Sequence, residues 1–160
     1  MQESQKIFNQ ELLKFLDLSP TPFHAVSQIA KILKKSGFRQ LGEGDKWNLK
    51  TGGKYYAIRN GSSLVAFIAG QSDPLKTGFR IVGAHTDSPC LMVKPNPDIT
   101  KNGYLQLGIE VYGGALLNPW FDRDLSIAGR IIFQTLDGRL EKKLIDFQRP
   151  ICIIPSLAIH

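Results

Sequence analysis

The sequence predicts an α/β fold that continues into a β-rich region, and three observations carry this prediction. Apolar residues recur at helical spacing between residues 7 and 33. From residue 54 onward the pattern changes to short strand-like runs separated by turn residues. One of these runs, residues 79–84, is apolar enough to lie inside a sheet. We therefore expect a first domain over residues 1–93 and a β-rich one over residues 94–160.

Two helices are expected first. The first should end at Ser19-Pro20, and the second should begin with Thr21 as N-cap and Pro22 in its first turn. Gly37 is well placed to end the second helix. His24, in the first turn, is assigned a packing or capping role. The apolar stripes of the two helices are Ile7, Phe8, Leu12, Phe15 and Leu16, and Phe23, Val26, Ile29, Ala30 and Leu33.

Strands follow the helices. Asn60-Gly61 is a strong hairpin signal between two strand-like runs. Pro95 and Pro97 should exclude regular structure and mark a domain boundary. Asp137-Gly138 predicts a further hairpin turn. The expected strands are residues 54–59, 63–69, 79–84, 104–111, 125–133 and 140–147.

His85 and Asp87 come directly after the expected strand 79–84. In open α/β sheets, ligands gather outside the carboxyl ends of strands. A histidine with a carboxylate two residues later suits a metal site, because the carboxylate can fix the imidazole tautomer. From spacing alone, a His-x-Asp sequence after a strand is more often an ordinary turn than a metal site.

Composition limits the class of protein. The 160 residues are 42% hydrophobic and 21% charged, as in globular domains. No apolar run approaches the ~20 residues needed to cross a bilayer, so no membrane partner is expected. Cys90 and Cys152 form no CxxC pair, which disfavours both a disulfide scaffold and a cysteine zinc site and fits a reducing cytoplasm.

The net charge of +6 raises the possibility of a nucleic-acid partner. The basic residues are scattered along the chain and mixed with acidic ones. Lys31, Lys34 and Lys35 form the densest group, and they lie on one side of the second expected helix, as on a solvated face. We therefore expect no nucleic-acid partner.

The last residues, 155–160, are apolar and contain no polar tail. Natural termini are usually solvated, so we expect the chain to be a fragment that stops within its second region.

Five motifs in this order resemble the aspartyl aminopeptidase (M18) family. They are residues 19–24 (SPTPFH), 82–89 (VGAHTDSP), 112–114 (YGG), 120–125 (WFDRDL) and 154–160 (IPSLAIH). The resemblance implies a dinuclear zinc exopeptidase that forms closed homo-oligomers. It also implies a zinc-peptidase α/β domain, begun by residues 1–93, that is interrupted by a β-rich lid or dimerisation domain, begun by residues 94–160.

By this resemblance His85 is a zinc ligand, and Asp87 is its catalytic carboxylate partner. His160 is expected to reach the active site of a neighbouring subunit and bind substrate, although a role as metal ligand and a plain strand-end histidine stay open. The family's other zinc ligands and its glutamate base come after the lid domain, at positions that this chain lacks. Asp122-Arg123-Asp124 is interpreted as a structural salt-bridge and turn element.

The resemblance implies hydrolysis of an N-terminal residue, possibly acidic, from a peptide substrate. Two Zn²⁺ ions per full-length subunit would supply a hydroxide at neutral pH, and a glutamate would transfer the proton to the leaving amine. The 160-residue chain alone should be inactive, because one histidine cannot hold two zinc ions. The alternative is a non-catalytic assembly or binding module that retains the fold.

Overall fold

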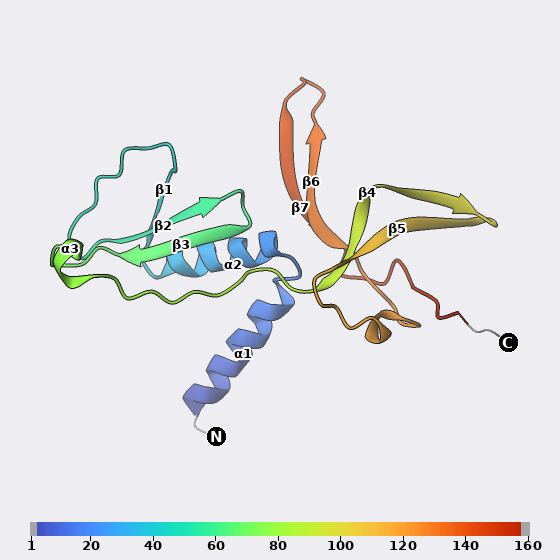
Figure 1. Cartoon of the computed structure of the whole chain (residues 1–160), viewed down its shortest axis with the longest axis horizontal. Coiled ribbons are helices and arrows are strands. Elements are labelled where there is room, and N and C mark those ends of the chain that lie inside the picture. The colour runs from blue at the N-terminus through green and yellow to red at the C-terminus, as the bar shows by residue number, and fades with distance from the viewer. Residues whose placement is uncertain (1–2, 158–160) are drawn as a thin grey trace. The chain divides into compact units, whose positions relative to one another are not determined.

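The structure, a computed structural model, describes residues 3–157 and confirms the predicted α/β fold class. Figure 1 shows its helices and strands. The helices are α1 (Glu3–Asp17), α2 (Pro22–Lys35), α3 (Pro74–Thr77) and the 3-10 turn η1 (Asn118–Trp120). The strands are β1 (Arg39–Leu41), β2 (Lys54–Arg59), β3 (Ser63–Ile68), β4 (Cys90–Lys101), β5 (Tyr104–Tyr112), β6 (Ala128–Gln134) and β7 (Leu140–Asp146). No helix in the described range is long and apolar enough to cross a membrane.

Both ends of α2 are confirmed. Thr21 has an extended backbone, and its hydroxyl accepts a hydrogen bond from the His24 backbone N–H at 3.4 Å. Gly37 has a φ of +81°, a conformation that costs other residues free energy. The Gly37 N–H donates to the Lys34 carbonyl and the Phe38 N–H to the Leu33 carbonyl, which forms a Schellman motif. Local sequence signals therefore set the length of this helix.

The first sheet has the order β1-β2-β3, with β1 parallel and β3 antiparallel to β2. Asn60 and Gly61 have φ values of +52° and +71°, and the Ser62 N–H donates to the Arg59 carbonyl at 3.2 Å. Positive φ at both central residues matches the twist of the flanking strands. The hairpin predicted at Asn60-Gly61 is confirmed, but Arg59 pairs with Ser63, so its loop has three residues where the sequence indicated two. β1 was not predicted because it has only three residues.

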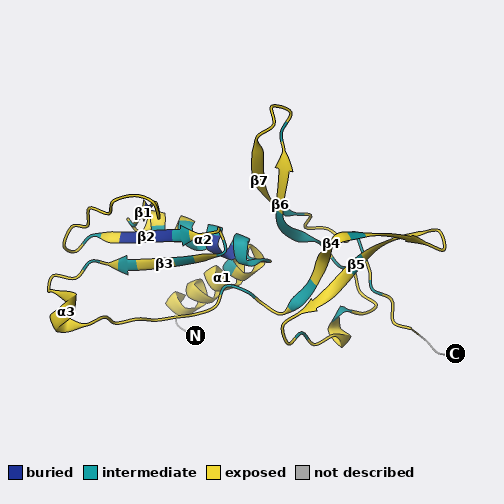
Figure 2. Cartoon of the chain, turned by 45° about the horizontal axis from the view of Figure 1, so that its top comes forward, coloured by how far each residue is buried: buried dark blue, intermediate teal, exposed yellow. Residues whose placement is uncertain are grey.

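The core lies where α2 packs against this sheet. Figure 2 shows buried residues in dark blue on α2 and β2. The residues of the core are Ala25, Val26, Leu41, Tyr55, Tyr56 and Ala57. Val26 is only 2% exposed, and burial of such a side chain stabilises a fold by about 1.5 kcal/mol or more.

The prediction of a strand at residues 79–84 is wrong. These residues run as extended chain without strand pairing, and Phe79, Ile81 and Val82 are 79%, 85% and 100% exposed. An apolar strand in a sheet interior needs a paired strand at its edges and covering layers on its faces. Within the described residues no strand pairs with this segment, so its apolar character alone does not make it a strand.

The expectation that Pro95 and Pro97 exclude regular structure is also wrong, because β4 runs through them. The β4–β5 register is interrupted between Val93 and Asp98, so that the prolines lie outside the regular ladder. A bulge of this kind accepts residues that lack an N–H. The strands predicted at residues 104–111 and 140–147 are confirmed as β5 and β7, and that at 125–133 begins later, as β6.

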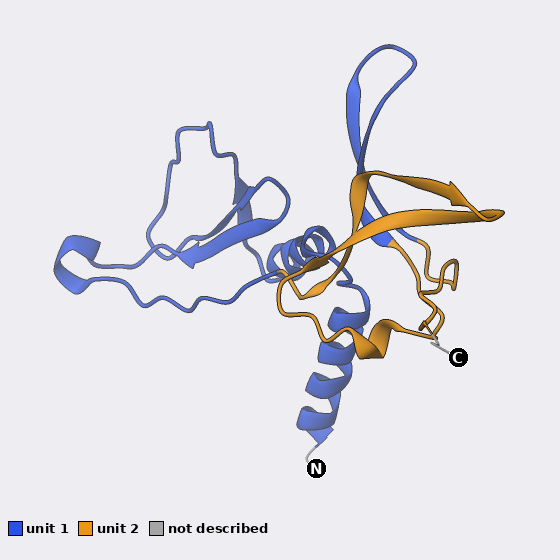
Figure 3. Ribbon diagram, turned by 45° about the vertical axis from the view of Figure 1, so that its right-hand side comes forward, with its two compact units in different colours: residues 1–86, 128–146 blue, residues 87–127, 147–160 orange. Residues whose placement is uncertain are grey.

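The chain divides into two compact units, which Figure 3 shows in different colours. Unit 1 contains residues 1–86 and 128–146, and unit 2 contains residues 87–127 and 147–160. In unit 1 the β6–β7 hairpin turns at the predicted Asp137-Gly138, where Gly138 has a φ of +83°. In unit 2, β4 and β5 form a two-stranded antiparallel sheet. The domain boundary expected near residue 94 concerns a longer protein and stays a prediction.

Candidate functional site

His85 lies in the extended segment that follows residues 79–84, and its side chain is exposed. The next residue is fixed: the Thr86 hydroxyl donates to the Ser62 carbonyl at 2.7 Å. Ser62 directly follows the Asn60-Gly61 turn of unit 1. The histidine is therefore held next to an anchored residue at the end of a rigid hairpin, although it does not end a strand.

Asp87 is held by unit 2. The Tyr112 hydroxyl, at the end of β5, donates to Asp87 Oδ2 at 2.7 Å. The hydrogen bond to Asp87, together with the negative charge of that carboxylate, raises the pKa of Tyr112 above its usual value. Cys90 lies opposite Tyr112 in the β4–β5 register, which brings the start of β4 beside the end of β5. Tyr112 was not predicted as a partner of Asp87, although Tyr112 opens one of the motifs that resemble the M18 family.

The division between the two units falls at residues 86 and 87, so His85 belongs to one unit and Asp87 to the other. Between residues 3 and 157, no group of three or more His, Cys, Asp or Glu residues could hold a metal ion. A catalytic zinc takes about three protein ligands and an open position. The described residues therefore do not complete a zinc site. His160 lies outside them.

The structural role expected for Asp122 is confirmed, but not through a salt bridge. Asp122 adopts a φ of +55° in a turn and accepts hydrogen bonds from the Ser156 backbone N–H, at 2.9 Å, and from the Ser156 hydroxyl. These hydrogen bonds lower the pKa of Asp122, and the bond from the Ser156 hydroxyl has the larger effect. The Asp122 N–H donates to the Ile154 carbonyl, so the turn is tied to the segment that carries Ser156. Sequence reasoning could not pair residues that are this far apart.

His24 takes the capping role that the sequence favoured. Its Nδ1 lies 2.8 Å from the Thr21 hydroxyl, at the start of α2. The imidazole therefore contacts the N-cap residue, and in the part of the chain that the structure describes no metal-binding group includes it.

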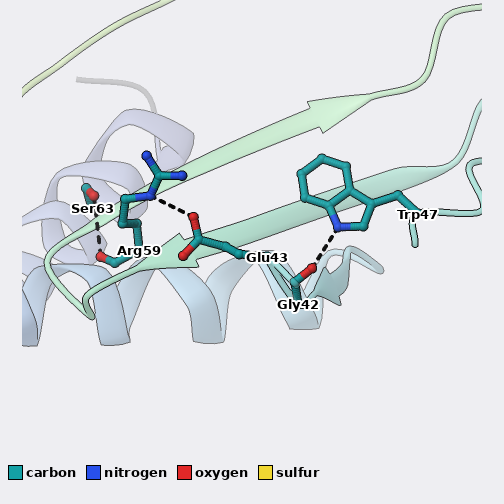
Figure 4. A network of polar contacts seen from close by, with 5 residues as sticks. All are labelled: Gly42, Glu43, Trp47, Arg59 and Ser63. Carbon is teal, nitrogen blue, oxygen red and sulfur yellow. Dashed lines mark hydrogen bonds and ion pairs between the residues drawn. The ribbon is translucent and has the colours of Figure 1, made fainter. Parts of the chain in front are cut away.

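A second polar cluster, shown in Figure 4, fixes the loop between β1 and β2. Arg59 Nε donates to Glu43 Oε1 at 2.7 Å, and Trp47 Nε1 donates to the Gly42 carbonyl at 2.7 Å. The Arg59 side chain is 80% exposed, so this ion pair contributes little stability. The cluster positions a surface loop and has the chemistry of neither a metal site nor a nucleophile.

Comparisons with known proteins agree on one family. The model of the family described as "Aminopeptidase I zinc metalloprotease (M18)" matches residues 15–160. The "Probable M18 family aminopeptidase 2" of Pseudomonas aeruginosa is 60% identical over 152 residues, which cover 95% of this chain and 35% of that protein. This chain thus spans about a third of the length of that curated relative.

Solved structures show the same likeness. "Structure of Chaetomium thermophilum mApe1" aligns with a TM-score of 0.86 at 40% identity, over 94% of this chain and 35% of that one. "Structure of S. cerevesiae mApe1 dodecamer" aligns with a TM-score of 0.86 at 35% identity, over 97% of this chain and 37% of that one. The fold described above is therefore shared with these proteins.

Proposed function

The chain belongs to the Aminopeptidase I zinc metalloprotease (M18) family, and we propose that it forms part of a zinc aminopeptidase that removes N-terminal residues from peptides. The family match over residues 15–160 carries this proposal. The exposed His85, next to the anchored Thr86, agrees with it, because a metal ligand must be accessible and held in place.

In this proposal His85 supplies one zinc ligand and Asp87 orients the site. Tyr112 in turn holds the Asp87 carboxylate through its hydroxyl. The described residues do not complete a zinc site. The family resemblance implies that the other ligands lie in the rest of a longer protein, with His160 as the alternative ligand from this chain. The 160-residue chain by itself is accordingly expected to show no aminopeptidase activity.

The finer features of the enzyme are also proposals. Two zinc ions per subunit, a preference for acidic N-terminal residues and a cytoplasmic location are expected from the family resemblance. The dodecamer named for the yeast relative supports a homo-oligomer. His160 is proposed to bind substrate in a neighbouring subunit, with a role as metal ligand as the alternative.

The test uses a chimera in which this chain replaces the matching 152-residue region of the Pseudomonas aeruginosa relative. The chimera should bind zinc and hydrolyse aminoacyl nitroanilides, among which the aspartyl compound probes acidic preference. His85→Ala should lose zinc and nearly all activity, because the substitution removes one of the zinc ligands. Asp87→Asn should lower the rate by roughly 10–100-fold through misorientation of the site.

His24→Ala is the matched histidine control. Because His24 contacts the N-cap Thr21, its loss should leave zinc content and rate near those of the unchanged chimera. Unchanged zinc and rate in His85→Ala would contradict the assignment of His85. A chimera that folds and assembles but has neither zinc nor activity would favour the non-catalytic module instead.

A further inference from the structure

Unit 1 contains a groove of about 670 Å³ that is lined by residues of α2, β2 and the β6–β7 hairpin. The helix contributes one face, which includes Phe23, Ala30 and Lys34. These residues recur at helical spacing and so point the same way. The volume lies within the range of about 300–1,000 Å³ that ligand pockets occupy.

Arg130 of β6 fixes the groove. Its Nη1 donates to the Asn60 carbonyl at 2.6 Å and lies 3.3 Å from Asn60 Oδ1. The guanidinium also lies over the ring of Phe23, 4.0 Å from its centroid. One side chain thereby joins the hairpin to the β2–β3 turn and to α2, so specific contacts hold the sides of the groove together.

The rim of the groove is strongly basic. Lys31 and Lys34 line it from α2, and Lys142 and Lys143 line it from β7. No aspartate or glutamate is among the described residues along the groove. Concave surfaces lined by charge of one sign concentrate the electric field and attract ligands of the opposite sign.

The lining of the groove is also partly apolar. Ile58 of β2 and Leu144 of β7 both line the groove. Leu144 lies opposite Arg130 in the β6–β7 register, and Lys142 is two residues from it on the same face of the hairpin. A ligand here would therefore meet lysines and apolar side chains side by side.

We propose that this groove binds an acidic peptide segment, whose carboxylates lie against the lysines and whose apolar side chains lie against Ile58 and Leu144. Charge complementarity identifies the acidic partner. A single-stranded nucleic acid is disfavoured because such ligands stack their bases on exposed aromatic rings. Here Arg130 covers the Phe23 ring, and Tyr56 is only 4% exposed. The proposal does not depend on the aminopeptidase assignment.

The experiment measures binding of a short fluorescent peptide, in which glutamate alternates with leucine, to the 160-residue chain by fluorescence polarisation. Lys34→Glu combined with Lys142→Glu should weaken binding by about 10-fold or more, because two attractive charges become repulsive. The matched control combines Lys14→Glu with Lys76→Glu, two exposed lysines outside the groove. It changes the net charge equally and should bind within about 2-fold of the unchanged chain. Circular dichroism of both variants checks that the fold is retained.

Four results would overturn the proposal. The first is absence of peptide binding at low salt. The second is equal weakening in the two double variants, which would mean attraction to net charge alone. In the third, a peptide with glutamine in place of glutamate binds equally well. In the fourth, single-stranded oligothymidylate binds more tightly than the peptide and loses that binding in the groove variant, which would assign the groove to nucleic acid.

Discussion

The β2–β3 hairpin and the segment at residues 79–84 are both rich in apolar residues, yet only the hairpin forms strands. The hairpin's two strands are neighbours in sequence, and α2 covers them. Tyr56 lies on the face of β2 toward α2 and Tyr55 on the other face, beside Phe67. They are 4% and 5% exposed, whereas Val82 is fully exposed. The contrast shows that an apolar pattern specifies a strand only where its partners are supplied nearby.

The free energy of strand formation also differs between the hairpin and residues 79–84. A short hairpin closes its turn at low entropic cost and gains ladder hydrogen bonds at once. Residues 79–84 have no such local partner, so their burial would depend on strands far away in sequence. Stability in this unit should therefore be concentrated in α2 and its sheet.

The largest expected effect comes from placing the same charge in each region. Val26→Asp should lower the free energy of unfolding by about 3 kcal/mol or more, because it buries an unpaired carboxylate. Val82→Asp should change it by less than about 0.5 kcal/mol, since Val82 is fully exposed. Urea unfolding, followed by Trp47 fluorescence in a Trp120→Phe background, reports on this sheet because Trp47 stacks on Phe67. Equal destabilisation by the two substitutions would show that residues 79–84 are packed.

A smaller effect is expected from two glycines. Gly37→Ala should destabilise the chain by about 1 kcal/mol, because φ at this residue is +81° and no atom lies close enough to compensate. Gly83→Ala should be nearly neutral, since a Cβ there meets open space and no left-handed φ is required. The same urea titration measures both. A neutral Gly37→Ala would mean that the end of α2 rearranges at no cost.

The smallest effect is local and concerns the place where the extended segment meets β5. Asp87→Asn should lower the pKa of Tyr112 toward its usual value of 10, because it removes the negative charge that favours the protonated phenol. Asp98→Asn is the control and should leave this pKa unchanged. The tyrosinate absorbance that disappears in Tyr112→Phe identifies the relevant titration. A Tyr112 pKa that stays raised in Asp87→Asn would mean that the negative charge of Asp87 is not its cause, since the asparagine oxygen can still accept the hydrogen bond.

Features with short-range signals could be predicted from the sequence. Thr21, Pro22 and Gly37 define α2, and Asn60-Gly61 defines the hairpin, because each acts on backbone atoms only a few residues away. Strand β4 was not predicted, because its prolines lie in an interruption of the β4–β5 register. No local sequence pattern indicates such an interruption.

The candidate site is a harder case. His85 and Asp87 were identified from their motif, and their roles stay predictions. The partnerships of Asp87 with Tyr112 and of Asp122 with Ser156 join residues 25 and 34 positions apart. No local pattern encodes such pairs, since they depend on how strands are brought together.

The interruption in β4 has a further consequence for how copies of the chain meet one another. A two-stranded sheet leaves a row of backbone N–H and C=O groups on each outer edge, and a regular edge is a template for strand addition and aggregation. Pro95 and Pro97 lack N–H groups and lie two residues apart, so in a regular strand both gaps would fall on one edge. With the register also broken between Val93 and Asp98, β4 is a poorer template for another chain than an uninterrupted strand of the same length.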